Sequence, residues 1–378
     1  MIAMATSLGR NILIGMGAGL LGGLVAGPVN SFLSWFISEK QRRRKIAIRE
    51  GSSQDVASSK IAKTLRGEEP SEQANRRRTA EEERLGRELP PWLAGALIVG
   101  TFALALWFEI KRPLRQQTQS KLKRDTRNLA MAAMSATAIS VFEKPIVRRL
   151  SQMVHQRGWG IVKLFRLPIW AEVGLAVVLF DYTLYIWHVL THKVPFLARF
   201  HRVHHADLDM DASTALRFHF GEMILSVPWR AAQVMTVGAA PLSLSMWQTL
   251  TTMAILFHHS NWRLPYDIER WLCRVIVTPR MHGIHHSIIM EETDANWSTI
   301  FSFPDFLHRT IRLNVPQKKL IIGLPVFRGE NDLTLGKLIP MPITAGNPSA
   351  QRPTELMRRE EPLELPNSVL ADSMERSN

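Results

Sequence analysis

Four long stretches of the chain carry little or no charge, and they limit the possible folds more than any other feature. About 20 consecutive apolar residues are needed for a helix to cross a hydrocarbon core of roughly 30 Å. Each stretch is about that long or longer, which predicts an all-α, polytopic membrane protein. The stretches are Asn11 to Ile37, Trp92 to Phe108, Pro168 to Trp187 and Ala231 to Phe257. A further apolar block, Leu129 to Phe142, is too short for an upright span.

The remaining segments define the domain boundaries. Residues 1–37 form an N-terminal apolar membrane segment, and residues 38–90 are a polar, charge-mixed linker or surface helix. Residues 91–343 contain the remaining apolar blocks and all the histidines, and they are expected to form the main membrane domain. Residues 344–378 are rich in Pro, Glu, Arg and Ser, which predicts a disordered tail.

The net charge of +14 comes largely from basic runs that border the apolar blocks, at 40–45 and 111–124. This placement is typical of juxtamembrane anchoring at anionic headgroups and does not favour nucleic acid. The positive-inside rule leaves the orientation of the chain in the membrane open. A single span between the two basic runs would place them on opposite faces of the bilayer. The only cysteine, Cys273, excludes an internal disulfide and a four-thiolate metal site.

Histidines are concentrated in one part of the chain: 11 of the 13 lie between His188 and His286, and the pattern H-x-x-H-H occurs there twice. On a helix, residues three and four apart share a face, so each box presents at least two imidazoles to one side. Histidine is the commonest side-chain metal ligand. The three boxes supply eight candidate catalytic ligands, about enough for two metal ions: His188, His192, His201, His204, His205, His282, His285 and His286.

Further histidines lie between these boxes, His219 in RFHFGE and His258 with His259 in FHHSN. A straight helix over 223–257 would place His219 and His259 on opposite sides of the bilayer. Ligands of one cluster must converge, so we expect the chain to turn back near Gly238 to Pro241, as two helices of about 16 residues. His155 and His308 lie outside the boxes and are expected to have no metal role.

Acidic residues near the boxes are candidates for a supporting role, because a carboxylate that accepts the outer N–H of a ligating imidazole fixes its tautomer. Asp181 lies on the same polar stripe as His188 and is the first candidate. Glu222, Asp207 and Asp294 are weaker ones. Asp209 and Asp211 are expected to form an exposed acidic turn.

A thiolate-free, all-imidazole site suits iron, zinc, copper or nickel. A closed zinc site needs only four ligands, whereas a dinuclear iron centre that activates O2 uses all eight.

The ordered boxes of this chain resemble the fatty acid hydroxylase superfamily, also called the sterol desaturase family, over roughly residues 92–340. The matching boxes are Asp181 to His192, Arg199 to His205, Arg217 to Glu222, Phe257 to Asn261, Thr278 to Ser287 and Asp294 to Trp297. Where many members end with W-D-R-L-F-G-T, this chain has PDFLHRT at 304–310 and keeps only Asp305, Leu307 and Thr310.

The resemblance implies a helical membrane domain with its histidine cluster on the cytosolic face, two non-haem iron ions, and O2-dependent hydroxylation or desaturation of a lipid. It adds His259 to the eight ligands, with His219 as a tenth, and it ranks His258 below His259. Asn261 becomes a further supporting residue.

Electrons would come from a separate reductase or electron-transfer protein, because the chain lacks a dinucleotide fingerprint, a haem-attachment motif and a cysteine cluster. Two other classes stay open: a zinc-dependent membrane hydrolase, and a non-catalytic relative that binds metal or lipid.

Overall fold

The computed structural model of the chain describes residues 72–346 except residue 166, and the side chains from residue 79 onward. The described residues from Arg78 onward belong to one compact unit. The apolar segment predicted at 1–37, most of the linker predicted at 38–90 and the tail predicted from 344 lie largely outside the described residues.

The described residues are helical and contain no strand, as the apolar blocks predict. The helices are α3 (Glu72–Leu85), α4 (Pro91–Lys111), α5 (Lys121–Ala138), α6 (Lys144–Arg157), α7 (Ile169–Lys193), α8 (Pro195–His205), α9 (Phe220–Val237), α10 (Pro241–His259), α11 (Tyr266–Leu272), α12 (Pro279–His285), α13 (Met290–Thr293), α14 (Phe303–His308), α15 (Leu335–Leu338) and α16 (Met341–Thr344). Short 3-10 turns occupy Ile161–Leu164, Thr214–Leu216, Gln317–Lys319 and Glu330–Leu333.

Three described stretches are long and apolar enough to cross a membrane: Pro91–Lys111, Lys121–Leu164 and Ile169–Lys193. The second corrects the prediction that Leu129 to Phe142 is too short. A π-helical turn, Ile139–Glu143, joins α5 to α6, so the apolar block lies inside one continuous helical run. These spans make the chain an integral membrane protein.

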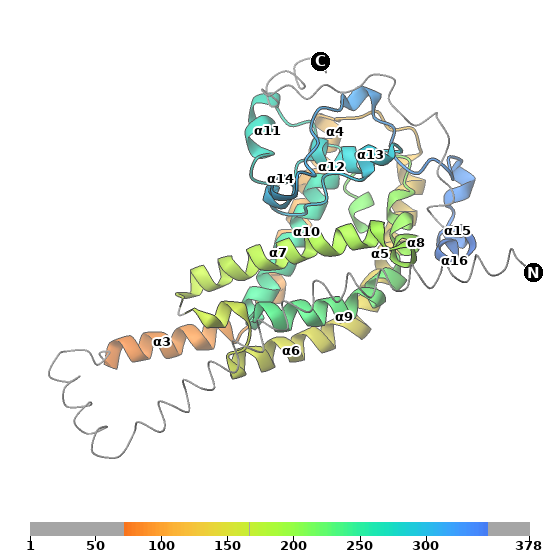
Figure 1. Cartoon of the computed structure of the whole chain (residues 1–378). Coiled ribbons are helices and arrows are strands. Elements are labelled where there is room, and N and C mark those ends of the chain that lie inside the picture. Colours follow the sequence, from red (N-terminus) through yellow and green to blue (C-terminus); the bar gives the residue numbers. More distant parts are fainter. Residues whose placement is uncertain (1–71, 166, 347–378) are drawn as a thin grey trace, which may run out of the picture. The chain divides into compact units, whose positions relative to one another are not determined.

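The segment 220–259 forms a helical hairpin, which confirms the predicted turn. α9 ends at Gly238 with φ 79°, a left-handed conformation that favours glycine, and α10 begins at Pro241. A Cβ at Gly238 would lie 2.3 Å from the carbonyl oxygen of Trp159, so a larger residue would also collide there. The hairpin returns the end of α10 to the same end of the molecule as the start of α9 (Figure 1).

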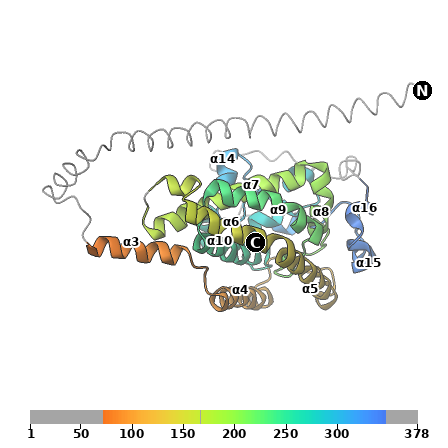
Figure 2. The same cartoon turned by 90° about the horizontal axis from the view of Figure 1, so that it is seen from below.

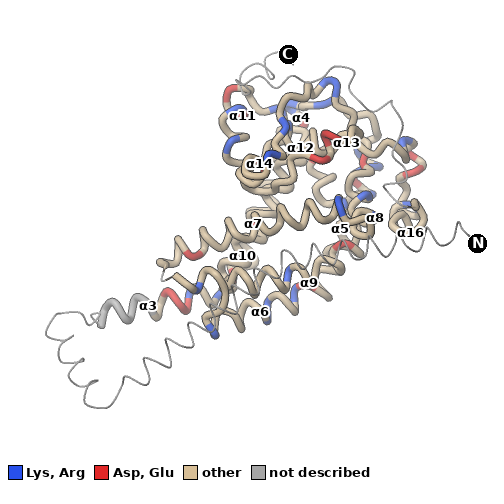
Figure 3. Tube along the Cα trace, in the orientation of Figure 1, with Lys and Arg blue, Asp and Glu red and all other residues tan. Residues whose placement is uncertain are grey.

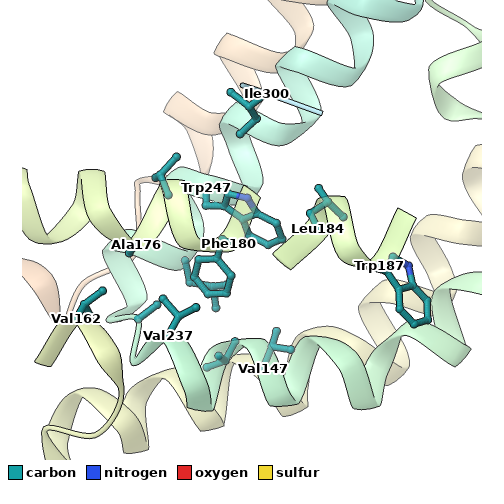
Figure 4. Close-up of a cluster of buried hydrophobic side chains, with 13 residues drawn as sticks. Val147, Val162, Ala176, Phe180, Leu184, Trp187, Val237, Trp247 and Ile300 are labelled. Atoms are coloured by element: carbon teal, nitrogen blue, oxygen red, sulfur yellow. The ribbon is translucent and has the colours of Figure 1, made fainter. Parts of the chain in front are cut away.

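The apolar core lies where α7, α9 and α10 meet. Phe180 of α7 stacks on Trp247 of α10 with ring centroids 4.6 Å apart, and Val237 of α9 packs beside them (Figure 4). α10 contains no charged residue, and α7 has only Glu172, Asp181 and Lys193 (Figure 3). This core fixes the directions in which α7 and α10 deliver their histidine-bearing C-terminal ends.

Candidate metal centre

Nine buried or half-buried histidines come together in two groups. In each group, one ligand atom per residue lies within 4.8 Å of all the others. The first group is His188, His192, His201, His205 and His285, and the second is His204, His259, His282 and His286. All eight histidines of the three boxes belong to these groups. His205 and His285 belong to the same group, as the predicted hairpin requires.

The two H-x-x-H-H boxes contribute to the groups in opposite ways. In α8, His201 and His205 enter the first group and His204 enters the second; in the second box, His282 and His286 enter the second group and His285 the first. Residues three and four apart share one broad face of a helix, but consecutive residues are rotated by about 100°, so the two adjacent histidines of a box point to different sites. One box can therefore supply ligands to two neighbouring sites, which explains why both boxes carry a third histidine.

Both box helices start at well-defined N-termini. Pro195 and Pro279 occupy first-turn positions, where the missing N–H of proline carries no penalty. The Thr278 hydroxyl also accepts a hydrogen bond from the Met281 N–H. These signals fix where each helix begins, and so which faces its histidines occupy.

Hydrogen bonds hold the outer nitrogen of several rings. Nδ1 of His188 donates to the carbonyl of Trp297 at 2.7 Å, and Nδ1 of His285 donates to the carbonyl of Ala295 at 2.9 Å. Nδ1 of His201 lies 2.9 Å from Glu222 Oε1, and Nδ1 of His259 lies 2.8 Å from the carbonyl of Ile255. In a neutral ring whose Nδ1 donates, Nε2 carries a lone pair. Four rings therefore turn lone pairs inward.

Several ring nitrogens have no hydrogen-bond partner among the described residues, although they are fully buried. A buried polar atom without a partner is costly, so such a set calls for an explanation. In the first group these atoms are Nε2 of His192, His201 and His285 and both nitrogens of His205. In the second group they are the outer Nδ1 atoms of His204, His282 and His286, because the Nε2 atoms of these rings face one another and His259.

The second group has nitrogens at metal-ligand spacing. Nε2 of His259 lies 3.0 Å from Nε2 of His204 and 3.1 Å from Nε2 of His282, which lies 3.2 Å from Nε2 of His286. Imidazole nitrogens about 2.1 Å from one metal ion and at right angles are separated by about 3 Å. The donor set and its spacing therefore fit a metal ion.

Burial keeps these rings uncharged. It lowers the pKa of His204, His205, His282, His285 and His286 well below the ordinary value, and the neighbouring imidazoles lower it further. Metal ions bind neutral imidazole, so the fold prepares these ligands in the required state.

Comparison with known proteins agrees with this geometry. The family model described as "Fatty acid hydroxylase" matches residues 173–310, a stretch that contains all nine grouped histidines. The chain is 30% identical over 134 residues to the ornithine lipid hydroxylase OlsE of Rhizobium tropici, covering 34% of this chain and 38% of that protein. Residues 173–310 of the chain therefore match the fatty acid hydroxylase family.

Other relatives are cholesterol 25-hydroxylases. The Rattus norvegicus protein is 26% identical over 159 residues, covering 40% of this chain and 51% of the relative. The Homo sapiens protein is 27% identical over 147 residues, covering 37% of this chain and 51% of the relative. The chain thus spans about half or less of these relatives. No solved structure matches it.

The predicted supporting residues have different roles in the structure. Glu222 bonds His201, as expected of a carboxylate that fixes a tautomer. Asp181 instead accepts the backbone N–H groups of Ile300 and Phe301 at 3.1 and 3.0 Å, so it positions a loop and no imidazole. Asp294 pairs with Lys193 at 2.6 Å. Asn261 exchanges hydrogen bonds with the backbone of Arg115.

The prediction of an exposed acidic turn at Asp209 and Asp211 is wrong, because both side chains are buried. Asp209 accepts the N–H groups of Thr118 and Gln119, and Asp211 pairs with Arg124 and Lys121. Asp207, also considered as a support for an imidazole, instead lies between Arg124 and Arg217 at 3.5 and 3.3 Å. These carboxylates fix the chain that leaves α8 directly after His205.

Two further predictions concern His219 and His258, and both side chains lie outside the two histidine groups. His219 lies in neither group: its Nδ1 accepts the Gly221 N–H at the start of α9, and its Nε2 bonds the carbonyl of Ile339. We therefore remove it from the ligand set. His258 is also outside both groups, with Nδ1 on the carbonyl of Thr299.

Backbone groups and an aromatic ring complete the site, and the sequence patterns did not assign them roles. The carbonyls that hold His188 and His285 belong to Trp297 and Ala295, on either side of Asn296, which adopts φ 55°. The Asn296 side chain bonds the carbonyls of Met281 and Arg312, which fixes this conformation. The Trp297 ring lies 4.6 Å from that of His192. In the sequence, the D-x-N-W box at Asp294 to Trp297 was the signal that could have identified these groups.

Proposed function

We propose that this chain is an O2-dependent lipid hydroxylase that uses two iron ions. The observation that carries the proposal is the pair of buried histidine groups in each of which one nitrogen per ring lies within 4.8 Å of all the others. The relatives named above are all lipid hydroxylases, which supports hydroxylation over desaturation and over a hydrolase.

The ligands of the first ion would be His188, His192, His201, His205 and His285, and those of the second His204, His259, His282 and His286. Two such ions supply reductive activation of O2 and attack on an unactivated C–H bond. The protein holds the imidazoles neutral and oriented. Glu222 and the carbonyls of Ala295 and Trp297 fix three rings of the first group, because each accepts an Nδ1 proton.

The chain also excludes water from the centre. Trp297 covers His188, His192 and His285 on one side, and Phe218 stacks on His204 with ring centroids 4.3 Å apart. A dry site limits side reactions of a strong oxidant. The substrate would be a sterol, an acyl lipid or a related hydrophobic molecule, taken from the bilayer in which the spans lie.

Electrons would be delivered by a separate reductase or electron-transfer protein, and basic segments such as 111–124 suit an acidic partner. The histidine groups would face the cytosol, where such donors are reduced.

The test is lipid profiling of cells that express the wild-type chain, the His285→Ala variant or the His155→Ala variant. His155 lies outside both groups and serves as the matched control. We expect a hydroxylated lipid with wild type and His155→Ala and its loss with His285→Ala. Growth under isotopically heavy O2 should label the new hydroxyl group.

Two results would contradict the proposal. A profile unchanged by His285→Ala, with iron bound in the wild type, removes the oxygenase. A product whose new oxygen comes from water, formed by a zinc-loaded protein without O2, identifies a hydrolase instead.

A further inference from the structure

An apolar surface outside the candidate spans is formed by α11, by α14 and by Val275, which follows α11 in the chain. We call it the α11–α14 surface and define it by Trp271, Val275, Phe303, Phe306 and Leu307. All five side chains are exposed, with Trp271 57%, Val275 60% and Leu307 63% accessible. Exposed apolar side chains gathered in this way mark an interaction site.

The surface is continuous because the two segments are joined through their backbones. The Ser302 N–H donates to the carbonyl of Val275 at 3.0 Å, and Ile276 and Phe301 form an antiparallel bridge. This brings Val275 next to the start of α14. In Figure 1, α11 and α14 are neighbours.

α14 is fixed against a membrane-spanning helix. Tyr182 of α7 bonds His308 at 3.0 Å, its ring stacks near Phe303, and Tyr185 bonds Thr310. Asp181 holds the backbone of Ile300 and Phe301. Figures 1 and 2 both show α14 beside α7.

The contact point on α7 indicates the depth of α14. Tyr182 precedes His188 by six residues, or about 9 Å along the helix, and precedes the end of α7 at Lys193 by about 16 Å. Since α7 is a candidate span, Tyr182 lies nearer the middle of the span than either histidine of this helix. α14 is therefore level with a part of α7 that lies within the bilayer or at its edge.

Basic side chains border the apolar ones. Arg274 lies over the Trp271 ring at 4.0 Å and Arg270 at 5.7 Å, and Arg309 directly follows α14. Apolar and aromatic residues beside arginines are typical of segments that lie at the boundary of headgroups and acyl chains. Tryptophan and arginine both suit this level, because each has an apolar part and a polar end.

We propose that the α11–α14 surface contacts the bilayer, with Phe303, Phe306 and Leu307 among the acyl chains and Arg274 at the phosphates. Its occupant is thus lipid, and neither a second copy of the chain nor a protein partner. The contact places the histidine-bearing end of α7 at the membrane boundary. It does not depend on the reaction that the histidine groups perform.

The test is spin labelling of the full chain in phosphatidylcholine nanodiscs, in a Cys273→Ser background. Labels are placed at Leu307→Cys and Val275→Cys, with Lys337→Cys on α15 as an exposed polar control. Collision rates with O2, which concentrates in acyl chains, are compared with those of a water-soluble nickel chelate.

We expect O2 collisions to exceed chelate collisions several-fold at 307 and 275, and the reverse at 337. A water-like response at 307 and 275 overturns the proposal. Low rates with both reagents also overturn it, because they show a protein surface covering these sites. Unchanged metal content of each variant verifies that the fold is retained.

Discussion

Two buried polar clusters lie side by side in this molecule, and they differ in how their groups are satisfied. In the histidine groups, inner nitrogens of His192, His205 and His285 have no partner among the described residues. In the carboxylate cluster that follows α8, Asp207 and Asp211 both face Arg124, and Arg217 faces Asp207. The first cluster consists of neutral rings at metal-ligand spacing, whereas in the second Asp207 and Asp211 each face an opposite charge.

The difference shows how a buried polar cluster can be interpreted. Charges removed from water are tolerated when each meets an opposite charge and further hydrogen bonds. Neutral imidazoles whose outer nitrogens are held and whose inner lone pairs converge instead match a preformed metal site. Changes in the histidine groups should therefore alter metal content, and changes in the carboxylate cluster should alter stability.

The largest effect is expected from removing one ligand of each group. His285→Ala should lose the first ion and His282→Ala the second, so that iron falls from about two ions to about one per chain in either variant. Product formation should fall at least about 100-fold, because both ions take part in the reaction. Metal analysis of the purified protein and product quantification measure these changes. Two ions retained in both variants would contradict the grouping.

The next effect concerns stability. Arg124→Met leaves Asp207 and Asp211 buried with fewer positive partners, and breaking a buried pair costs about 3–5 kcal/mol. Lys123→Met, at the exposed neighbouring position, should change stability by less than about 0.5 kcal/mol. Unfolding in detergent compares the two. Equal stabilities would show that the carboxylate cluster is not held by its charge pairs.

The parts of the site that depend on local spacing were predictable. Histidines at three- and four-residue intervals on helices identified the eight box histidines that the structure brings together in two groups. The hairpin of α9 and α10 was predicted because His219 and His259 were both expected to be ligands, and the structure has the hairpin although His219 belongs to neither group. Gly238 and Pro241 supply the local signals for the turn.

The parts that depend on distant contacts were not predictable. Asp209 and Asp211 look like an exposed turn because their partners, Thr118 and Arg124, lie about 90 residues earlier in the chain. Asp181 shares a stripe with His188, yet it bonds the backbone of Ile300 and Phe301. The division of each H-x-x-H-H box between two groups depends on how α8 and α12 pack, which spacing alone does not fix.

A smaller effect is expected at the residue that supports a ligand. Glu222→Ala removes the carboxylate that holds Nδ1 of His201, and loss of such a partner lowers metal affinity or activity about 10- to 100-fold. Glu172→Ala is the control: it removes a buried acid of α7 that pairs with Lys163, far from the histidines in sequence. Iron titration of both variants distinguishes support of the metal site from general loss of a buried charge. Equal iron affinity in the two would exclude a supporting role for Glu222.

The smallest effect is expected at His219, which separates the two kinds of buried histidine. Its Nδ1 caps the start of α9, so His219→Ala should cost about 1 kcal/mol of stability, as the loss of an N-cap does. Iron content should stay at the wild-type level, because both ring nitrogens already bond the backbone. His219→Asn, which can still cap the helix, should recover most of the stability. If His219→Ala lost an ion instead, the boundary drawn between ligand and structural histidines would be wrong, since burial and proximity to a box would then suffice to make a histidine a ligand.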